Sequence, residues 1–319
     1  MKFAQNNQFN ILLALSACAL VSIYYALSKG LPAYSLYQIF KNPPSDFTII
    51  FYQLRLPRVL SGFICGAMLG LAGLLMQLLL ANPLADPYLL GVSSGATLGS
   101  TLAIAFGVQA SLGYAAAWGG SIGVSLLMLA LAYIYKWRQQ DLLLIGVAIA
   151  ALLSAIMSCM FLTMNTREIR SMYFFLNGDL TATHLPIIEA IALTLSILIC
   201  CKLRWPWQLL QRGESTAKTL GVAVERHYLI ILLISSGLTA LAVILGGCIG
   251  FIGMIVPQLA KRYYGENYLY LPWVVCLGGG SLVVLADSLG QTLLAPAQIP
   301  VGIMTVLLGV PVFFYLIKK

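Results

Sequence analysis

The sequence has very little charge. Asp, Glu, Lys and Arg together make up 9% of its 319 residues, whereas 60% are hydrophobic. Soluble globular domains carry about 25% charged residues, so the composition excludes that class. It predicts instead an all-α polytopic membrane protein, in which most of the chain is bilayer-spanning helix.

Motifs for catalysis and for metal binding are also missing from the sequence. There is no GxxxxGK[ST] phosphate loop, so we expect the chain not to bind ATP by itself in the usual way. The seven cysteines lie scattered in apolar stretches without a CxxC pair or a neighbouring histidine, which excludes a disulfide framework and a zinc site. The two histidines, His184 and His227, fall at the edges of loops and outside any metal-ligand spacing. We therefore expect no catalytic residue, no metal site and no cofactor bound by this chain.

Ten apolar runs are present that can each be interpreted as a crossing of roughly 30 Å of hydrocarbon. They lie at 11–28, 57–80, 87–106, 113–135, 142–164, 186–201, 229–246, 248–260, 271–291 and 300–317. The first lacks a cleavage site and is read as a retained helix, and 248–260 is short and rich in glycine. We expect one transmembrane domain over residues 1–319.

The basic residues predict the orientation of these runs. With ten spans and the N-terminus in the cytoplasm, twelve of the 18 Lys and Arg residues fall inside and six outside, as the positive-inside rule favours. Both termini are then cytoplasmic. The net charge of +8 sets orientation and requires no nucleic-acid partner.

Small residues recur at every fourth position around the stretch ANPLADPYLLGVSSGA, residues 81–96. The glycines concerned are Gly62, Gly66, Gly70, Gly91, Gly95 and Gly99. Such spacing lets helix backbones approach closely, and we interpret it as helix packing. Between the two sets we expect a tight cytoplasmic turn, with one helix ending near Asn82 and Pro83 and the next capped by Asp86.

Acidic residues are almost absent from the apolar runs. Asp287 is the only carboxylate within a span, and Glu189 lies near the start of another. An acid inside the membrane is a candidate functional group, but Asp287 near the outer interface is equally consistent with a hydrogen bond to a neighbouring helix. The scarcity of acids disfavours a proton- or sodium-driven carrier and indicates that another component supplies energy.

The longest polar segment, about 202–228, contains LLQRGESTAKTLGVAVERH at 209–227. It predicts a short helix, a break at Gly221 and a second short helix on the membrane face. Two interpretations remain open here, a contact with a partner and a passive surface anchor. Arg55 and Arg58, at the outer start of a span, depart from the positive-inside pattern; snorkelling to the interface is one interpretation of them.

Four blocks of the sequence resemble the signature blocks of one family. They are RLPRVLSGFICGAMLGLAGLLMQLLLANPLADPYLLGVSSGA (55–96), RGESTAKTLGV (212–222), GCIGFIGMIVPQLAKRYYG (247–265) and QIPVGIMTVLLGVPVF (298–313). The chain is similar, from about residue 11 to its end, to the FecCD family, the membrane permeases of ABC importers for iron-siderophores, haem and cobalamin.

The resemblance implies a ten-helix type II importer permease in the bacterial cytoplasmic membrane, in contact with membrane lipid. It also implies a second permease subunit, identical or paralogous, two cytoplasmic ATPase subunits that use ATP and Mg, and a periplasmic or lipoprotein substrate-binding protein. The chain is then a transport subunit and not an enzyme. Iron-siderophore is the first expected cargo and cobalamin the second, with haem or an oxyanion as alternatives. A secondary carrier that needs no ATPase, and an inactive or exporter-like permease, are the alternative classes.

The resemblance further implies roles for particular residues. Those that match the family's ATPase-coupling motif are Glu214, Ser215, Ala217, Lys218, Leu220 and Gly221. Arg55 and Arg58 match arginines that receive acidic side chains of the binding protein, a role suited to the planar guanidinium group. Three positions depart from the family, which commonly has Arg at Gln291, Glu at Gln298 and His at Gln258. We expect Gln291 to mark a weakened third docking contact.

Overall fold

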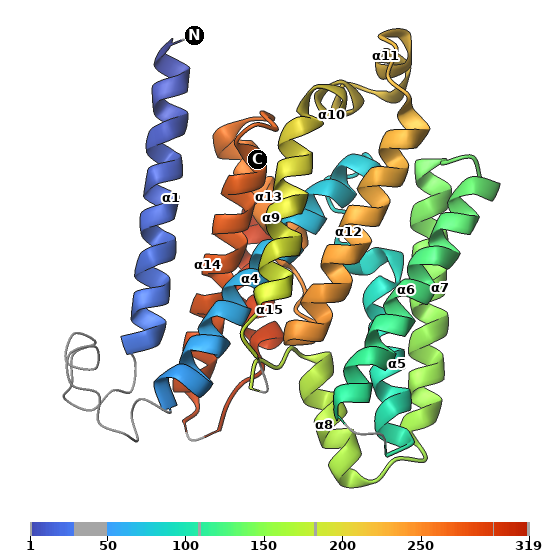
Figure 1. Cartoon of the computed structure of the whole chain (residues 1–319), viewed down its shortest axis with the longest axis vertical. Coiled ribbons are helices and arrows are strands. Elements are labelled where there is room, and N and C mark those ends of the chain that lie inside the picture. The colour runs from blue at the N-terminus through green and yellow to red at the C-terminus, as the bar shows by residue number, and fades with distance from the viewer. Residues whose placement is uncertain (1, 29–49, 108–109, 182–183, 296, 318–319) are drawn as a thin grey trace.

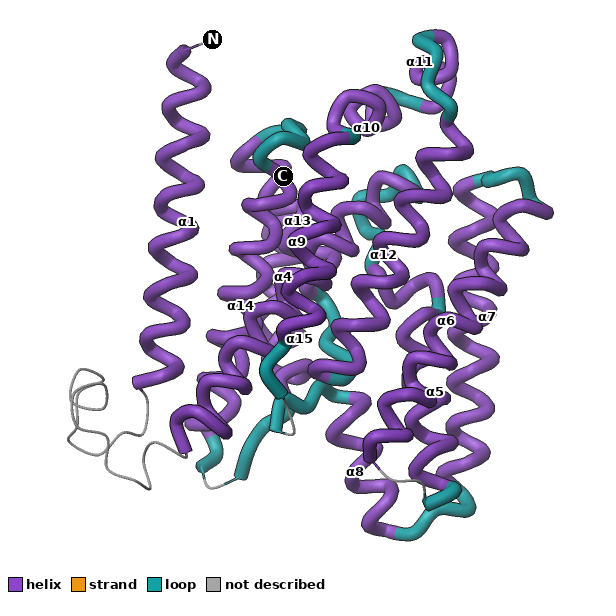
Figure 2. Tube along the Cα trace, in the orientation of Figure 1, coloured by secondary structure: helices purple, strands orange, loops and turns teal. Residues whose placement is uncertain are grey.

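The computed structural model describes residues 2–28, 50–107, 110–181, 184–295 and 297–317. Within these ranges every regular element is a helix, which confirms the all-α prediction (Figure 1, Figure 2). The elements are α1 (Lys2–Ser28), η1 (Ile50–Arg55), α4 (Leu56–Leu79), η2 (Pro87–Leu90), α5 (Val92–Ala105), α6 (Ala110–Ile134), α7 (Gln139–Phe161), α8 (Thr166–Leu176), α9 (Ile187–Lys202), α10 (Arg204–Gln211), α11 (Glu214–Thr219), α12 (Val224–Gly246), α13 (Ile252–Tyr264), α14 (Leu271–Leu293) and α15 (Val301–Ile317).

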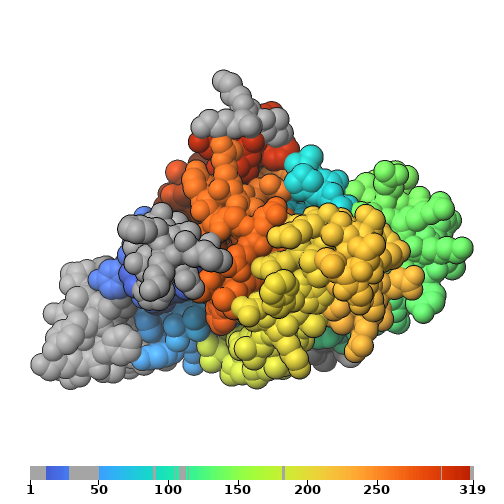
Figure 3. Space-filling model, turned by 90° about the horizontal axis from the view of Figure 1, so that it is seen from above, coloured from blue at the N-terminus to red at the C-terminus, as the bar shows by residue number. Residues whose placement is uncertain are grey.

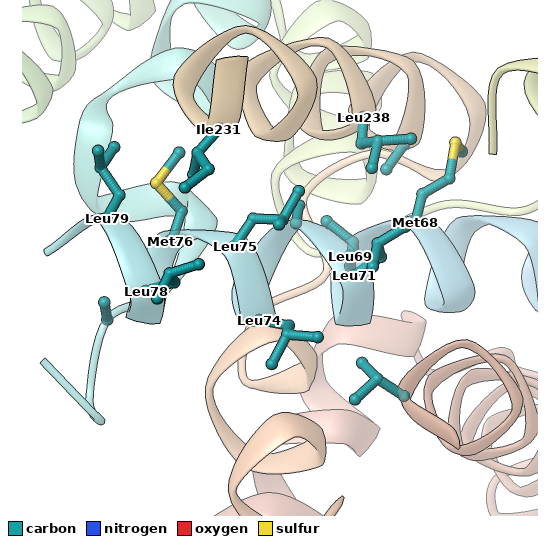
Figure 4. Close-up of a cluster of buried hydrophobic side chains, with 14 of the residues drawn as sticks. Met68, Leu69, Leu71, Leu74, Leu75, Met76, Leu78, Leu79, Ile231 and Leu238 are labelled. Atoms are coloured by element: carbon teal, nitrogen blue, oxygen red, sulfur yellow. The ribbon is translucent and has the colours of Figure 1, made fainter. Parts of the chain in front are cut away.

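Helix α4 forms the centre of the fold. It packs against α12, α13 and α14, and its leucines and methionines contact α12 residues such as Ile231 and Leu238 in one buried cluster (Figure 4). A helix that is apolar all round is stable only when it is buried in protein or lipid. On one flank α5, α6 and α7 pack together, and on the other α1 lies against α14 (Figure 1). The two flanks therefore meet through the α4 core.

Nine of the ten predicted spans each correspond to one helix of the structure, and the span at 87–106 corresponds to η2 and α5. Five described helices are long and apolar enough to cross a bilayer unaided: Ile50–Leu79, Ala115–Ile134, Gln139–Phe161, Val224–Gly246 and Leu271–Leu293. The N-terminal end of α1 and the C-terminal end of α15 lie toward the same end of the molecule as α10 and α11 (Figure 1). This arrangement is compatible with ten crossings, a number that stays a prediction.

The span expected at 87–106 is interrupted. Asp86 caps η2 by accepting a hydrogen bond from the backbone N–H of Tyr88 at 2.9 Å. Gly91 then adopts a left-handed φ of 73° and separates η2 from α5. Gly91 thus separates two helical segments, in a conformation that glycine adopts at little cost. The spacing had predicted that it would lie within a helix, at a packing position.

The short span at 248–260 is a helix preceded by irregular backbone. Helix α13 has 13 residues and reaches about 20 Å at 1.5 Å per residue, so it begins inside the protein. The chain around this break is bonded to the end of α8 and to the residues that follow it: the N–H of Cys248 donates to the carbonyl of Phe175 at 3.0 Å, and the N–H of Asp179 donates to the carbonyl of Gly246 at 2.9 Å. Non-helical backbone is tolerated at membrane depth where protein satisfies its hydrogen bonds in this way.

Two of the recurrent glycines lie where helix backbones meet within the chain. A Cβ at Gly66 of α4 would overlap the carbonyl oxygen of Gly279 on α14, and a Cβ at Gly95 of α5 would overlap that of Gly120 on α6. Gly119, the neighbour of Gly120, is exposed and has open space where a Cβ would be. The faces that carry Gly66 and Gly95 therefore look onto protein.

We predict that Gly66→Leu and Gly95→Leu each lower the yield of monodisperse protein in detergent, whereas Gly119→Leu leaves it unchanged. Overpacking of a tight contact costs about 1–3 kcal/mol, and both side chains would meet backbone that cannot rotate away. Size-exclusion chromatography of the three variants measures the effect. Equal yields would show that the helix pairs separate without loss of the fold.

Candidate functional site

The segment α10–α11 is the polar feature at one end of the molecule, and its residues form part of the face seen in Figure 3. The break between its two short helices lies at Arg212–Gly213, where Gly213 has a φ of 116°, and not at Gly221 as the sequence predicted. Gly221 has a φ of 82° and ends α11 before α12 begins. Both glycines have positive φ, and one lies on each side of α11.

The six residues that match the coupling motif lie on α11 and immediately after it. Five are exposed and one is buried: Glu214, Ser215, Lys218, Leu220 and Gly221 face outward, and Ala217 faces the protein. Lys218 Nζ donates to Glu214 Oε1 at 2.6 Å, and this exposed pair raises the pKa of Lys218. Leu220 is 60% exposed, which leaves an apolar side chain at the tip of a polar segment.

Buried aromatic residues fasten this segment to the helical body. Trp207 of α10 is fully buried and packs edge-on against Tyr268, with ring centroids 6.3 Å apart. Tyr268 lies in the connection between α13 and α14. On the other side Tyr228, in the first turns of α12, contacts Trp137 and accepts a hydrogen bond from Gln139 Nε2 at 2.9 Å. The segment is thereby packed against the residues that precede α14, and α12, which follows it, is bonded to the first residue of α7.

The turn that contains Asn82 and Pro83 lies across a cavity from α11. The cavity measures about 590 Å³, and Asn82, Pro83 and Glu214 are among its lining residues. Gln258 of α13 donates to the carbonyl of Pro83 at 2.6 Å and to Gln77 Oε1 at 3.2 Å. The structure thus brings the turn, the coupling motif and Gln258 to one place, and assigns Gln258 the task of holding the turn.

At the opposite end, Arg58 and Gln291 converge on Asp287. Arg58 binds the carboxylate with two hydrogen bonds, Nε to Oδ2 at 3.0 Å and Nη2 to Oδ1 at 2.8 Å. Gln291 Nε2 donates to Oδ2 at 2.7 Å, and Arg58 Nη1 donates to Gln298 Oε1 at 3.2 Å. Arg55 ends η1, three residues before Arg58. Of the two readings left open for Asp287, the structure shows the hydrogen bond to a neighbouring helix.

A second cavity, of about 690 Å³, opens near the irregular segment that precedes α13. Its lining is mostly apolar and includes Tyr88, Asn177, Phe251 and Met254. Tyr88 accepts a hydrogen bond from the N–H of Ile249 at 2.8 Å, which places its ring at the break between α12 and α13. Sequence reasoning named none of these as site residues; the glycine-rich stretch at 246–253 was the signal that could have indicated them.

Comparison with known proteins agrees with these features. The family model of the FecCD transport family matches residues 12–319. The hemin transport system permease protein HmuU of Yersinia pestis is 37% identical over 279 residues, which cover 85% of this chain and 83% of that protein. The cobalamin import system permease protein BtuC of Halobacterium salinarum is 35% identical and covers 92% and 81%, and the molybdate import system permease protein MolB of Haemophilus influenzae is 33% identical and covers 85% and 81%.

A solved structure has the same fold. It is described as an inward-facing conformation of a metal-chelate type ABC transporter, and it matches with a TM-score of 0.85 and 28% identity over 97% of this chain and 99% of that one. The match confirms the type II importer permease architecture expected from the resemblance. The chain belongs to the FecCD transport family and is an integral membrane permease of the ABC transporter class.

Proposed function

We propose that this permease imports a metal chelate across the bacterial cytoplasmic membrane, with ATP hydrolysed by a separate pair of ATPase subunits. The observation that carries the proposal is the polar α10–α11 segment. Its buried Trp207 holds it against the helical body, and Leu220 at its end is exposed. Iron-siderophore is the first candidate cargo and cobalamin the second. The hemin and molybdate relatives support haem and an oxyanion as alternatives.

The proposed assembly contains two permease subunits, identical or paralogous, two ATPases and a substrate-binding protein. The α10–α11 end faces the cytoplasm in this proposal, as do both termini, and the Arg58 end faces the binding protein. Glu214, Ser215, Lys218, Leu220 and Gly221 contact the ATPase, and Ala217, which is buried, packs α11 against the rest of the permease. Arg55, Arg58 and Gln291 lie on the docking side. The apolar cavity at Phe251 supports a path beside α13 and α15.

The transport activity can be measured in proteoliposomes that contain the permease together with its ATPase partner. We expect uptake of a ferric siderophore, cyanocobalamin, hemin or molybdate that requires both ATP and the substrate-binding protein. Comparison of the four identifies the cargo. Uptake that persists without the ATPase would instead support a secondary carrier and contradict the proposal.

We predict that Leu220→Asp weakens binding of the ATPase. An apolar side chain at the centre of an interface can contribute about 2 kcal/mol, which corresponds to roughly a thirtyfold change in affinity. Thr219→Asp adds the same charge at the adjacent exposed position and serves as the control. Affinity of the purified ATPase for each variant is the measurement, and an unchanged affinity for Leu220→Asp would exclude α11 as the contact.

Gly221 offers a separate test of coupling. Its Cβ would meet open space within the permease, so a substitution strains the left-handed backbone without a clash inside the chain. We predict that Gly221→Val lowers substrate uptake per ATP hydrolysed, whereas Gly221→Asn, which tolerates positive φ, stays near the native ratio. Normal coupling in both variants would show that this turn does not transmit motion.

We predict that Arg55→Glu weakens docking of the substrate-binding protein by an order of magnitude or more. Charge-assisted hydrogen bonds contribute roughly 1.5–3 kcal/mol each, and rising salt should weaken native docking in the same direction. ATPase activity measured without the binding protein should not change. If native and variant permeases dock equally at low and high salt, Arg55 makes no docking contact.

A further inference from the structure

All three nitrogens of the Arg58 guanidinium group donate within the chain, through three of its five N–H groups. Its Nε and Nη2 bind Asp287 and its Nη1 binds Gln298. Asp287 is correspondingly occupied, because Oδ2 also accepts from Gln291. The side chain of Asp287 is 7% exposed and that of Arg58 is 18% exposed. The pair is therefore a largely buried, bidentate ion pair at the end of the molecule that the proposed function assigns to docking.

A carboxylate that arrives from a partner meets Arg58 under these constraints. Asp287 already occupies the edge of the guanidinium group formed by Nε and Nη2, so a second carboxylate can bind with two hydrogen bonds only at the edge formed by Nη1 and Nη2, where Nη1 already donates to Gln298. The carboxylate of Asp287 also neutralises the positive charge that would attract an acid. Gln298, a neutral and exposed acceptor, is the weakest of the occupants and the one nearest to solvent.

We propose that Asp287 is an internal competitor for the positive charge of Arg58, and that a carboxylate of the substrate-binding protein must displace Gln298 and share Arg58 with Asp287 in order to dock. The inference rests on the proposed function, because it concerns the binding-protein face of the importer. Docking strength is then set by the difference between the partner's ion pair with Arg58 and the internal one. Because of Asp287, a binding protein docks strongly only if its carboxylate is well placed to bind Arg58, and other binding proteins dock weakly.

Displacement at Arg58 also has an effect inside the chain. Gln298 belongs to the connection between α14 and α15, where the N–H of Ile299 donates to Gly290 at 3.1 Å. Two residues further on, the N–H of Val301 donates to Gly178 at 3.2 Å. Release of Gln298 by an incoming carboxylate thus loosens the segment that leads into α15.

The test compares native permease with Asp287→Asn and Gln298→Ala. Asn keeps the shape of Asp and removes its charge, so docking of the substrate-binding protein should tighten about tenfold at low salt. Gln298→Ala, at an exposed position, should tighten docking by about twofold and keeps the test valid if Asp287→Asn folds poorly. Adding Arg58→Gln to Asp287→Asn should abolish the gain. A merely structural ion pair predicts the opposite, a loss of docking affinity in Asp287→Asn.

Glu189→Gln is the matched control. Glu189 is the other buried acid of the described spans: its side chain is 7% exposed, like that of Asp287, and it pairs with His184 at 3.3 Å instead of with an arginine. Its replacement removes an equivalent charge and should leave docking unchanged. Equal tightening by Glu189→Gln would show a general charge effect and overturn the proposal, as would unchanged or weaker docking in Asp287→Asn and Gln298→Ala.

A second measurement needs no partner protein. Phenylglyoxal modifies accessible arginine side chains, and peptide mass spectrometry reports its reaction at Arg58. We expect Asp287→Asn to increase the modification of Arg58 severalfold and Glu189→Gln to leave it at the native level. If native permease docks no substrate-binding protein, the proposed function fails, while this labelling still decides whether Asp287 shields Arg58. Labelling of Arg58 at the native rate in Asp287→Asn overturns the inference itself.

Discussion

The close approach of α4 and α14 is the contact on which the rest of the structure depends. It is possible because Gly66 and Gly279 present bare backbone to each other, with Gly70 against the carbonyl of Val275 one turn further along. Without water in the bilayer, such helices associate through packing and hydrogen bonds instead of hydrophobic burial. The Arg58–Asp287 ion pair joins the same two helices at one end. This helix pair is therefore held both by close backbone packing at the glycines and by an ion pair.

Helix α14 of that central pair extends between the two ends of the molecule. It begins three residues after Tyr268, which packs against Trp207 of the α10–α11 segment, and it carries Asp287 near its other end. One packed helix therefore reaches from the neighbourhood of the α10–α11 segment to the ion pair with Arg58.

Much of this architecture could be predicted from the sequence, because it follows from strong local signals. Long apolar runs predicted the helices, and Asp86 followed by Pro87 predicted the cap that the structure shows. The pairing of Arg58 with Asp287 could not be predicted in this way, although both residues had been singled out, because 229 residues separate them and nothing local identifies α14 as the neighbour of α4. Position 251 was equally hidden, since Phe251 adopts a left-handed φ of 72° that phenylalanine rarely takes.

The departures at 258, 291 and 298 become intelligible only together with their neighbours. Gln258 donates to a carbonyl, Gln291 donates to Asp287, and Gln298 accepts from Arg58. The amide NH₂ groups of Gln258 and Gln291 thus donate to oxygen acceptors, and the amide oxygen of Gln298 accepts from a guanidinium donor. Sequence alone showed three isolated changes, whereas two of them belong to one hydrogen-bonded cluster.

The long separation between Arg58 and Asp287 has a consequence for biogenesis. At about 5–20 residues per second, a ribosome needs roughly 10–50 s to add the 229 residues between them. During that interval α4 is in the membrane without its counter-ion, and the guanidinium group must remain among lipid headgroups, where a long side chain can reach water. The two interpretations of Arg58, a snorkelling side chain and a partner for an acid, then describe successive stages in the life of one residue.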